Sequence, residues 1–149
     1  GVIMDIHDTK DLHRMFYLFV SLCQEKINAP FETMVREQLS LMQFYTLCAV
    51  HLHEPVSMTN LSSILYIPKQ NATKIVDRLI DAGLAERRAA PSDRRVTLVS
   101  ATPAGVSFLT DISKAYTEKM FAHIHMLGEK DFQAFFSAME EISRILRKL

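Results

Sequence analysis

The sequence is poor in residues that interrupt regular structure, with four glycines and five prolines in 149 residues. Because these residues mark turns, their scarcity favours long helices over a fold of many short strands. Cysteine is equally scarce, since only Cys23 and Cys48 occur and they form no C-x-x-C pair. A disulfide framework is thereby excluded and a reducing, cytoplasmic location is expected. No apolar run is long enough to span a membrane, and no leader pattern is visible at the start.

The chain also lacks an excess of charge of either sign, because its formal net charge is zero. The distribution is uneven, however. Between Pro68 and Arg95 there are seven basic and four acidic residues, which gives this segment +3 and leaves −3 for the remainder. A local basic excess within a neutral protein is what a DNA-facing surface requires.

Apolar residues at three- and four-residue spacing predict an amphipathic helix from Lys10 to Ala29, ended by Pro30. A second helix is expected after Ser40, which forms a capping-box pattern with Gln43, and it runs to about His53. The last helix, residues 129–148, has a broad apolar face. Such excess apolar surface on terminal helices favours a subunit interface.

The middle of the chain has the pattern of two short helices followed by a hairpin. Ser57 or Thr59 could cap the first of these helices. A glycine, Gly83, would stop the second, and Thr102 followed by Pro103 would start the next long helix. The expected elements are helices over residues 60–65 and 69–82, strands over 84–89 and 96–101, and a helix from 103 to about 127.

This order predicts a mainly α fold with a small β-hairpin wing, a winged helix-turn-helix with N- and C-terminal dimerisation helices. We expect one domain over residues 1–149. Within it, residues 39–102 would form the DNA-binding unit, and residues 10–38 and 103–149 would form the dimerisation helices.

The stretch from Val56 to Gly105 resembles the MarR family. The resemblance is carried by N-L-S-S-I-L-Y-I-P at residues 60–68, by A-T-K-I-V-D-R-L-I-D-A-G-L-A-E-R at 72–87 and by S-D-R-R-V-T-L-V-S-A-T-P-A-G at 92–105, with residues 39–47 matching the preceding helix. It implies a homodimer that binds a pseudo-palindromic operator on double-stranded DNA, usually as a repressor. Many members are released by small phenolic or other lipophilic ligands, some by cysteine oxidation and a few by zinc.

In such a fold the helix over 69–82 would enter the major groove. Gln70 and Asn71 suit bidentate contacts with adenine, and Lys69 suits guanine or phosphate. The expected phosphate contacts from this helix and its neighbour are Thr73, Lys74, Arg78, Ser57 and Asn60. The alternative is an ordinary solvated helix face, which the attached wing disfavours.

The expected wing carries a cluster of arginines. By resemblance, Arg95 is the first candidate for insertion into the minor groove, where a bidentate pair with Asp93 would fix its side chain. Arg94 is the second candidate or a phosphate contact, and Arg87 and Arg88 would add phosphate contacts. The alternative is a plain surface ion pair.

Other residues suggest weaker hypotheses. An effector pocket could be shared by Phe19, Met42, Phe44 and Met58. Cys23, with Lys26 one turn further on, is a candidate redox sensor, whereas Cys48 resembles a core residue.

The pairs His51-x-His53 and His123-x-His125 point to opposite helix faces, so no metal site is expected. No catalytic motif and no cofactor-binding pattern occurs, which predicts that the protein is not an enzyme. A winged-helix interaction module without DNA binding, or a redox- or metal-responsive regulator, remains the alternative.

Overall fold

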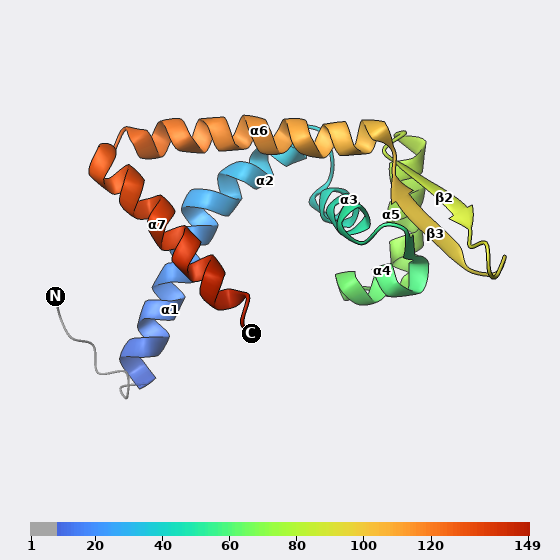
Figure 1. The fold of residues 1–149 in the computed structure, drawn as a ribbon, viewed down its shortest axis with the longest axis horizontal. Coiled ribbons are helices and arrows are strands. Elements are labelled where there is room, and N and C mark those ends of the chain that lie inside the picture. The colour runs from blue at the N-terminus through green and yellow to red at the C-terminus, as the bar shows by residue number, and fades with distance from the viewer. Residues whose placement is uncertain (1–8) are drawn as a thin grey trace. The chain divides into compact units, whose positions relative to one another are not determined.

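The computed structural model describes residues 9–149, which form seven α-helices, one π-helical turn and three short strands. The elements are α1 (Thr9–Cys23), η1 (Gln24–Asn28), α2 (Ala29–Arg36), α3 (Leu41–His53), β1 (Val56–Ser57), α4 (Met58–Leu65), α5 (Lys69–Asp81), β2 (Ala85–Ala89), β3 (Thr97–Ala101), α6 (Pro103–His125) and α7 (Glu129–Leu146) (Figure 1). The chain divides into two compact units between Ile112 and Ser113. The predicted mainly helical fold with a β-hairpin wing is confirmed.

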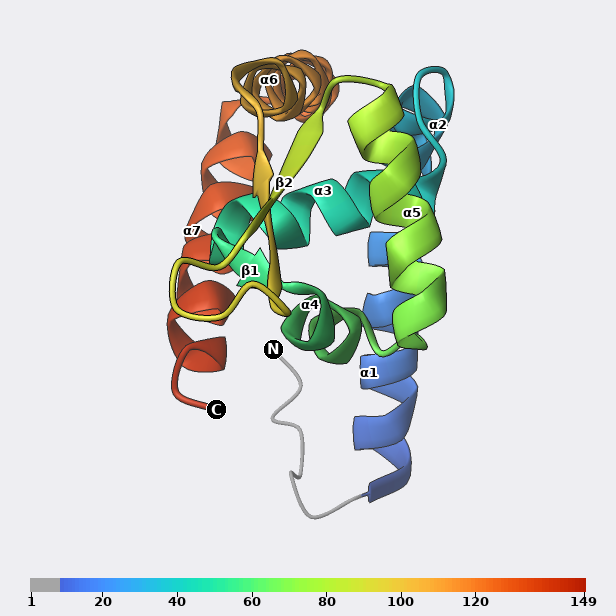
Figure 2. The ribbon, with the colours of Figure 1, turned by 90° about the vertical axis from the view of Figure 1, so that its right-hand side faces the viewer.

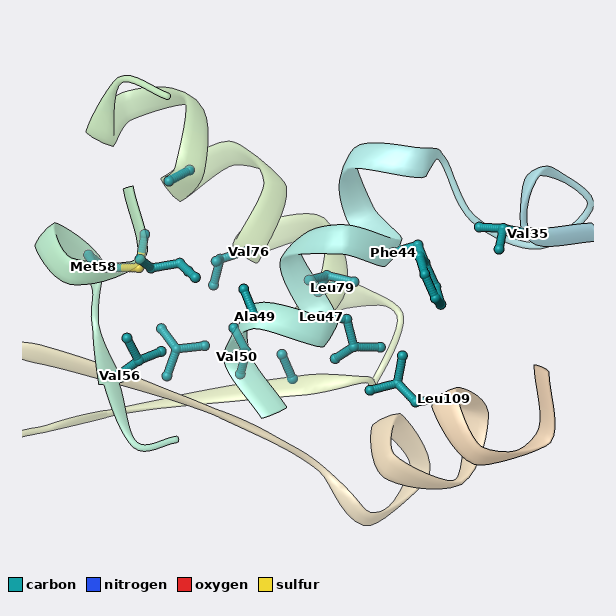
Figure 3. Packing of buried hydrophobic residues seen from close by; sticks show 14 of the residues in the cluster. Val35, Phe44, Leu47, Ala49, Val50, Val56, Met58, Val76, Leu79 and Leu109 are labelled. Atoms are coloured by element: carbon teal, nitrogen blue, oxygen red, sulfur yellow. The ribbon is translucent and has the colours of Figure 1, made fainter. Parts of the chain in front are cut away.

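The core of the first unit is built around α3. Phe44, Leu47 and Val50 of this helix are buried among residues of α4, α5 and the strands (Figure 3). On α5 the buried side chains Ala72, Val76 and Leu79 follow the three- and four-residue spacing of one helix face. The opposite face of α5 is therefore free to meet solvent or a ligand.

Local capping explains where the central helices begin. The Ser40 hydroxyl accepts a hydrogen bond from the Gln43 N–H at 3.2 Å, and the Gln43 side chain accepts one from the Ser40 N–H at 3.0 Å. This is the predicted capping box. Of the two candidates for α4, Ser57 is the cap, since its hydroxyl accepts from the Asn60 N–H at 3.1 Å. These caps satisfy amide groups that have no partner within the helix.

The prediction that Pro30 ends the first helix is wrong. Helix α1 passes through the π-helical turn η1 into α2, and Pro30 lies in the first turn of α2. Proline is accepted in the first turn of a helix because its fixed φ suits the helical conformation. The π-helical turn ends at Asn28, directly before α2, so the helical path changes its hydrogen-bond pattern next to the proline instead of ending there.

The hairpin predicted over residues 84–101 is present as β2 and β3, and a third strand joins it. The antiparallel sheet has the order β1-β3-β2, with Val56 opposite Val99 and Arg87 also opposite Val99 on the other side. Strand β1 was not predicted, because two residues are too few to show an alternating pattern. It attaches the start of α4 to the base of the hairpin.

A close backbone contact joins the turn after α5 to the start of α6. The Thr102 hydroxyl donates to the carbonyl oxygen of Gly83 at 2.6 Å and accepts from the Gly105 N–H at 3.0 Å. The Thr102 N–H also donates to the carbonyl oxygen of Leu84 at 3.1 Å. Thr102 is thus the predicted N-cap of α6, and it also fixes α5 against the hairpin.

The second unit, residues 113–149, contains the C-terminal part of α6 and all of α7. Its packing is aromatic: the Phe121 ring meets Phe136 edge to face at 4.9 Å between centroids, and Phe132 lies 4.9 Å from Phe136. Such edge-to-face arrangements are the favoured geometry for aromatic pairs. Several apolar side chains of α7, including Ile145 and Leu146, remain exposed.

Within residues 9–149, none of the helices combines the length and apolar character needed to cross a membrane.

The junction at Gly105 gives a stability prediction. A Cβ atom at Gly105 would lie 2.0 Å from the carbonyl oxygen of Leu84. Glycine to alanine in a helix ordinarily stabilises, yet we expect Gly105→Ala to destabilise the fold by about 1–3 kcal/mol or more through overpacking. Urea unfolding followed by circular dichroism measures the change.

Gly83→Ala is the matched control. Gly83 has φ +75° but open space around it. Its alanine variant should lose only the cost of a left-handed alanine, about 1–2 kcal/mol. A Gly105→Ala protein as stable as the wild type would show that the close approach does not constrain the fold.

Candidate nucleic-acid interface

A solvent-open groove of about 450 Å³ lies where α4, α5 and the hairpin meet. Figure 2 shows α4 between the first turn of α5 and the loop end of the hairpin. The groove brings together the residues Ser57, Met58, Thr59, Lys69, Thr73, Arg87, Arg95, Val96 and Thr97. Its walls therefore combine three cationic side chains with four hydroxyls, which is the chemistry that binds phosphate groups.

The N-terminal half of α5 is the exposed edge of this groove. Lys69, Gln70, Asn71 and Lys74 are exposed, as is Arg78 one turn further on. Their exposure follows from the burial of Ala72, Val76 and Leu79 on the other side of the same helix. The predicted base-contacting and phosphate-contacting residues of this helix thus lie on its free face.

Thr73 is the exception on α5, because it is half-buried and lines the groove. Its hydroxyl donates to the carbonyl oxygen of Lys69 at 3.0 Å. The oxygen keeps its lone pairs, so Thr73 can accept a further hydrogen bond but has its proton engaged.

An ion pair joins α5 to β2 beside the groove. A guanidinium nitrogen of Arg87 lies 2.5 Å from a carboxylate oxygen of Asp77, and both side chains are partly exposed. Along β2, Ala85 and Arg87 share one face while Arg88 points to the other. Arg87 therefore faces α5 and the groove, whereas Arg88 lies on the outer face of the wing.

The wing tip is held differently from the prediction. Asp93 accepts a hydrogen bond from the backbone N–H of Arg95 at 3.0 Å, and the Val96 N–H donates to the Asp93 carbonyl oxygen at 3.0 Å. Among the ion pairs of residues 9–149, none joins Asp93 to the guanidinium of Arg95. A short aspartate side chain accepts a hydrogen bond from the backbone N–H two residues further on more readily than it pairs with the long side chain of that residue. Asp93 thus shapes the loop backbone.

The arginines of the tip remain exposed and available. Arg94 and Arg95 are both exposed, and Arg95 contributes to the groove wall together with Val96. Below them, the Ala90 N–H donates to the carbonyl oxygen of Val96 at 2.8 Å and closes the loop. The tip is therefore a closed turn that presents two cations.

Ser57 and Asn60 meet at the start of α4. Ser57 lines the groove, and its hydroxyl is the cap that accepts from the Asn60 N–H. The Asn60 side chain is exposed at the first turn of the helix. A helix N-terminus with free amide groups favours anionic ligands, so this position suits a phosphate.

The four residues of the predicted effector pocket do not come together. Phe44 and Met58 are buried at separate ends of the core cluster (Figure 3), while Phe19 and Met42 are exposed. Phe44 packs edge to face on Phe31 at 5.3 Å between centroids. Phe44 and Met58 are thus packing residues, because an apolar side chain at helical spacing is satisfied by the core itself.

The two cysteines differ in their surroundings. Burial raises the pKa of the Cys48 thiol, which favours its protonated form. Cys23 is half-buried at the end of α1, and Lys26 pairs with its neighbour Glu25 at 2.5 Å. The lysine expected to activate Cys23 therefore has a carboxylate partner.

One histidine of each His-x-His pair lies close to a glutamate carboxylate. A ring nitrogen of His51 lies 3.4 Å from Glu54, and one of His125 lies 3.7 Å from Glu129. Across the part of the chain that the structure describes, no three histidine, cysteine, aspartate or glutamate side chains are grouped as a metal site would require.

Two features of the groove have no signal in the local sequence. The Asp77–Arg87 pair joins residues ten apart on different elements, which no local pattern reveals. Thr59 and Thr97 line the groove only because β1 pairs with β3. The alternation Ala85, Arg87, Ala89 along β2 was the one signal that could have placed Arg87 on the inner face.

Proteins of known family resemble this chain in sequence and in structure. Residues 37–96 match the model of the MarR family, which confirms the predicted resemblance. The HTH-type transcriptional repressor NicR of Pseudomonas putida is 35% identical over 72 residues, which are 48% of this chain and 46% of NicR. The match thus spans a little under half of that relative.

Solved structures share the fold over nearly the whole chain. The transcriptional regulator Tm0710 of Thermotoga maritima is 18% identical with a TM-score of 0.74, covering 93% of this chain and 96% of its own. FabT of Streptococcus pneumoniae, solved in complex with DNA, is 15% identical with a TM-score of 0.64, covering 92% and 98%. At these identities the likeness establishes the fold.

Proposed function

We propose, on the premise that residues 37–96 match the model of the MarR family, that the protein is a DNA-binding transcriptional regulator rather than an enzyme. The observation that carries the proposal is the groove between α5 and the wing. Lys69, Arg87 and Arg95 converge on it from three separate parts of the chain. The cations of the groove outnumber the one carboxylate paired with them, that of Asp77, and this excess of positive charge favours an anionic partner such as the DNA backbone.

In the proposed complex, α5 lies in the major groove of double-stranded DNA and the wing contacts the adjacent backbone or minor groove. Gln70 and Asn71, exposed in the first turn, contact base edges, and adenine is the base that their amides match best. Lys74, Arg78, Asn60 and Arg88 contact phosphates and set the register. Arg95 enters the minor groove, with Arg94 beside it.

We propose that the regulator is a homodimer. Helix α1 has no buried residue, and its large apolar side chains are exposed in the single chain. Phe16 is 69% exposed and Tyr17 is 76% exposed. An apolar surface of this extent on one helix marks an association site. A dimer with two-fold symmetry would engage two half-sites roughly 34 Å apart.

Repression fits the relative NicR, which is described as a transcriptional repressor. Release by a small lipophilic or phenolic ligand follows from the resemblance to the MarR family. Such a ligand acts if it binds more tightly to the form of the dimer whose helix spacing does not match the operator.

The first prediction concerns Arg95. We expect Arg95→Ala to weaken binding to a DNA duplex roughly tenfold at low salt and to reduce the slope of log affinity against log salt by about one. Fluorescence anisotropy with a short duplex of mixed sequence, repeated over a salt series, measures both quantities.

Arg36→Ala is the control for Arg95, because Arg36 lies on α2 outside the groove. It should leave the salt slope unchanged. If the wild-type protein does not bind double-stranded DNA even at low salt, the result favours the alternative of a winged-helix interaction module without DNA binding.

The second prediction tests the dimer. Phe16→Asp places a charge on the exposed apolar side of α1, so we expect the variant to be a folded monomer with much weaker DNA binding. His13→Asp introduces the same charge at an exposed polar position of α1 and should remain dimeric. Analytical ultracentrifugation distinguishes the two, and a dimeric Phe16→Asp protein would place the interface elsewhere.

The third prediction concerns release. Titration of simple phenolic carboxylates into the complex with the DNA upstream of the protein's own coding region should lower the affinity for that DNA. Footprinting first locates the site. If no compound of this class changes the affinity, the proposal of phenolic release is wrong while that of DNA binding stands.

A further inference from the structure

The acidic residue at the edge of the cationic groove has no role in the function proposed above. Lys69 and Thr73 line the groove, and Asp77 follows them at the same four-residue spacing on α5. Residues at this spacing lie above one another on a helix face. The carboxylate of Asp77 therefore lies next along the row of α5 residues that faces the wing.

The partner of Asp77 is one of the three cations of the groove. The Arg87 guanidinium lies 2.5 Å from the Asp77 carboxylate, and no such pair involves Lys69 or Arg95 among the described residues. Both side chains of the pair are partly exposed, at 36% for Arg87 and 50% for Asp77. An exposed ion pair adds little stability, so stability alone is a weak reason for an acid at this position.

The pair changes what the groove offers to an anion. A guanidinium bound to a carboxylate in its own protein has to exchange that partner before it can bind a phosphate. If the Arg87 guanidinium leaves the Asp77 carboxylate to bind a DNA phosphate, one negative charge is neutralised while another is uncovered. The salt dependence of binding reports the net number of phosphates neutralised, so such an exchange adds nothing to it.

We propose that Asp77 is a positioning residue that holds Arg87 against α5 and withholds its charge from the DNA backbone. The proposal rests on the proposed DNA binding and deepens it, because it divides the cations of the groove into two classes. Lys69 and Arg95 meet phosphates directly, whereas Arg87 stays paired to Asp77 in the complex.

The experiment measures the salt slope with a short duplex of mixed sequence, so it needs no knowledge of the operator. Asp77→Asn releases Arg87 and should steepen the slope by about one and raise affinity at low salt. The double variant Asp77→Asn/Arg87→Gln removes both charges of the pair and should return to the wild-type slope. Asp77→Glu keeps the charge and should also match the wild type.

Asp81→Asn is the matched control, since Asp81 is exposed one turn further along α5. It removes an equal charge and should not change the slope. Thermal unfolding of each variant tests that the fold is intact. The slope is the decisive quantity because a purely structural role of the pair would not steepen it.

Two results would overturn the proposal while leaving DNA binding in place. One is an Asp77→Asn/Arg87→Gln protein whose slope is lower than the wild type by about one, which would mean that Arg87 already contacts a phosphate. The other is an Asp77→Asn protein with an unchanged or shallower slope. Absence of binding by every form at low salt would overturn the proposed function together with this inference.

Discussion

The approach of α6 to the turn after α5 is the constraint on which the interface depends. Gly105 has no side chain, and this lets the backbone of α6 reach the Leu84 carbonyl, while Thr102 bonds to Gly83 on one side and to Gly105 on the other. One short segment thereby fixes the end of α5, the start of β2 and the end of β3. Because the groove lies between α5 and the hairpin, this contact constrains the two elements that form its walls.

The electrostatics of the groove depend on that geometry rather than on the total charge. The chain as a whole is neutral, yet Lys69, Arg87 and Arg95 reach one concave surface from α5, β2 and the wing loop. The same packing brings Asp77 to Arg87, so the surface contains both an accessible charge and a neutralised one. The electrostatic potential of the groove is a property of the folded protein. A count of charged residues along a segment only indicates where such a potential can form.

Much of the fold could be predicted because its signals are local. The capping box at Ser40, the glycine stop at Gly83 and the threonine cap at Thr102 each act within a few residues, and each is present. The exposed face of α5 followed from the spacing of its buried residues. The errors arose where partners are distant or conformations unusual: the π-turn before Pro30, the two-residue strand β1 and the backbone role of Asp93. Phe44 and Met58, expected to line a pocket, lie in the packed core, because apolar composition does not distinguish a core from a cavity.

The sequence by itself determined the order of helices and strands, the residues that cap them and the side chains that α5 leaves exposed, since hydrophobic spacing and capping act along the chain. Only the tertiary structure decided which exposed residues share a groove and that Arg87 pairs with Asp77. The physical reason is that these contacts join elements far apart along the chain. Their distances depend on how α3, α5 and the sheet pack together, and no pattern within one segment specifies that packing.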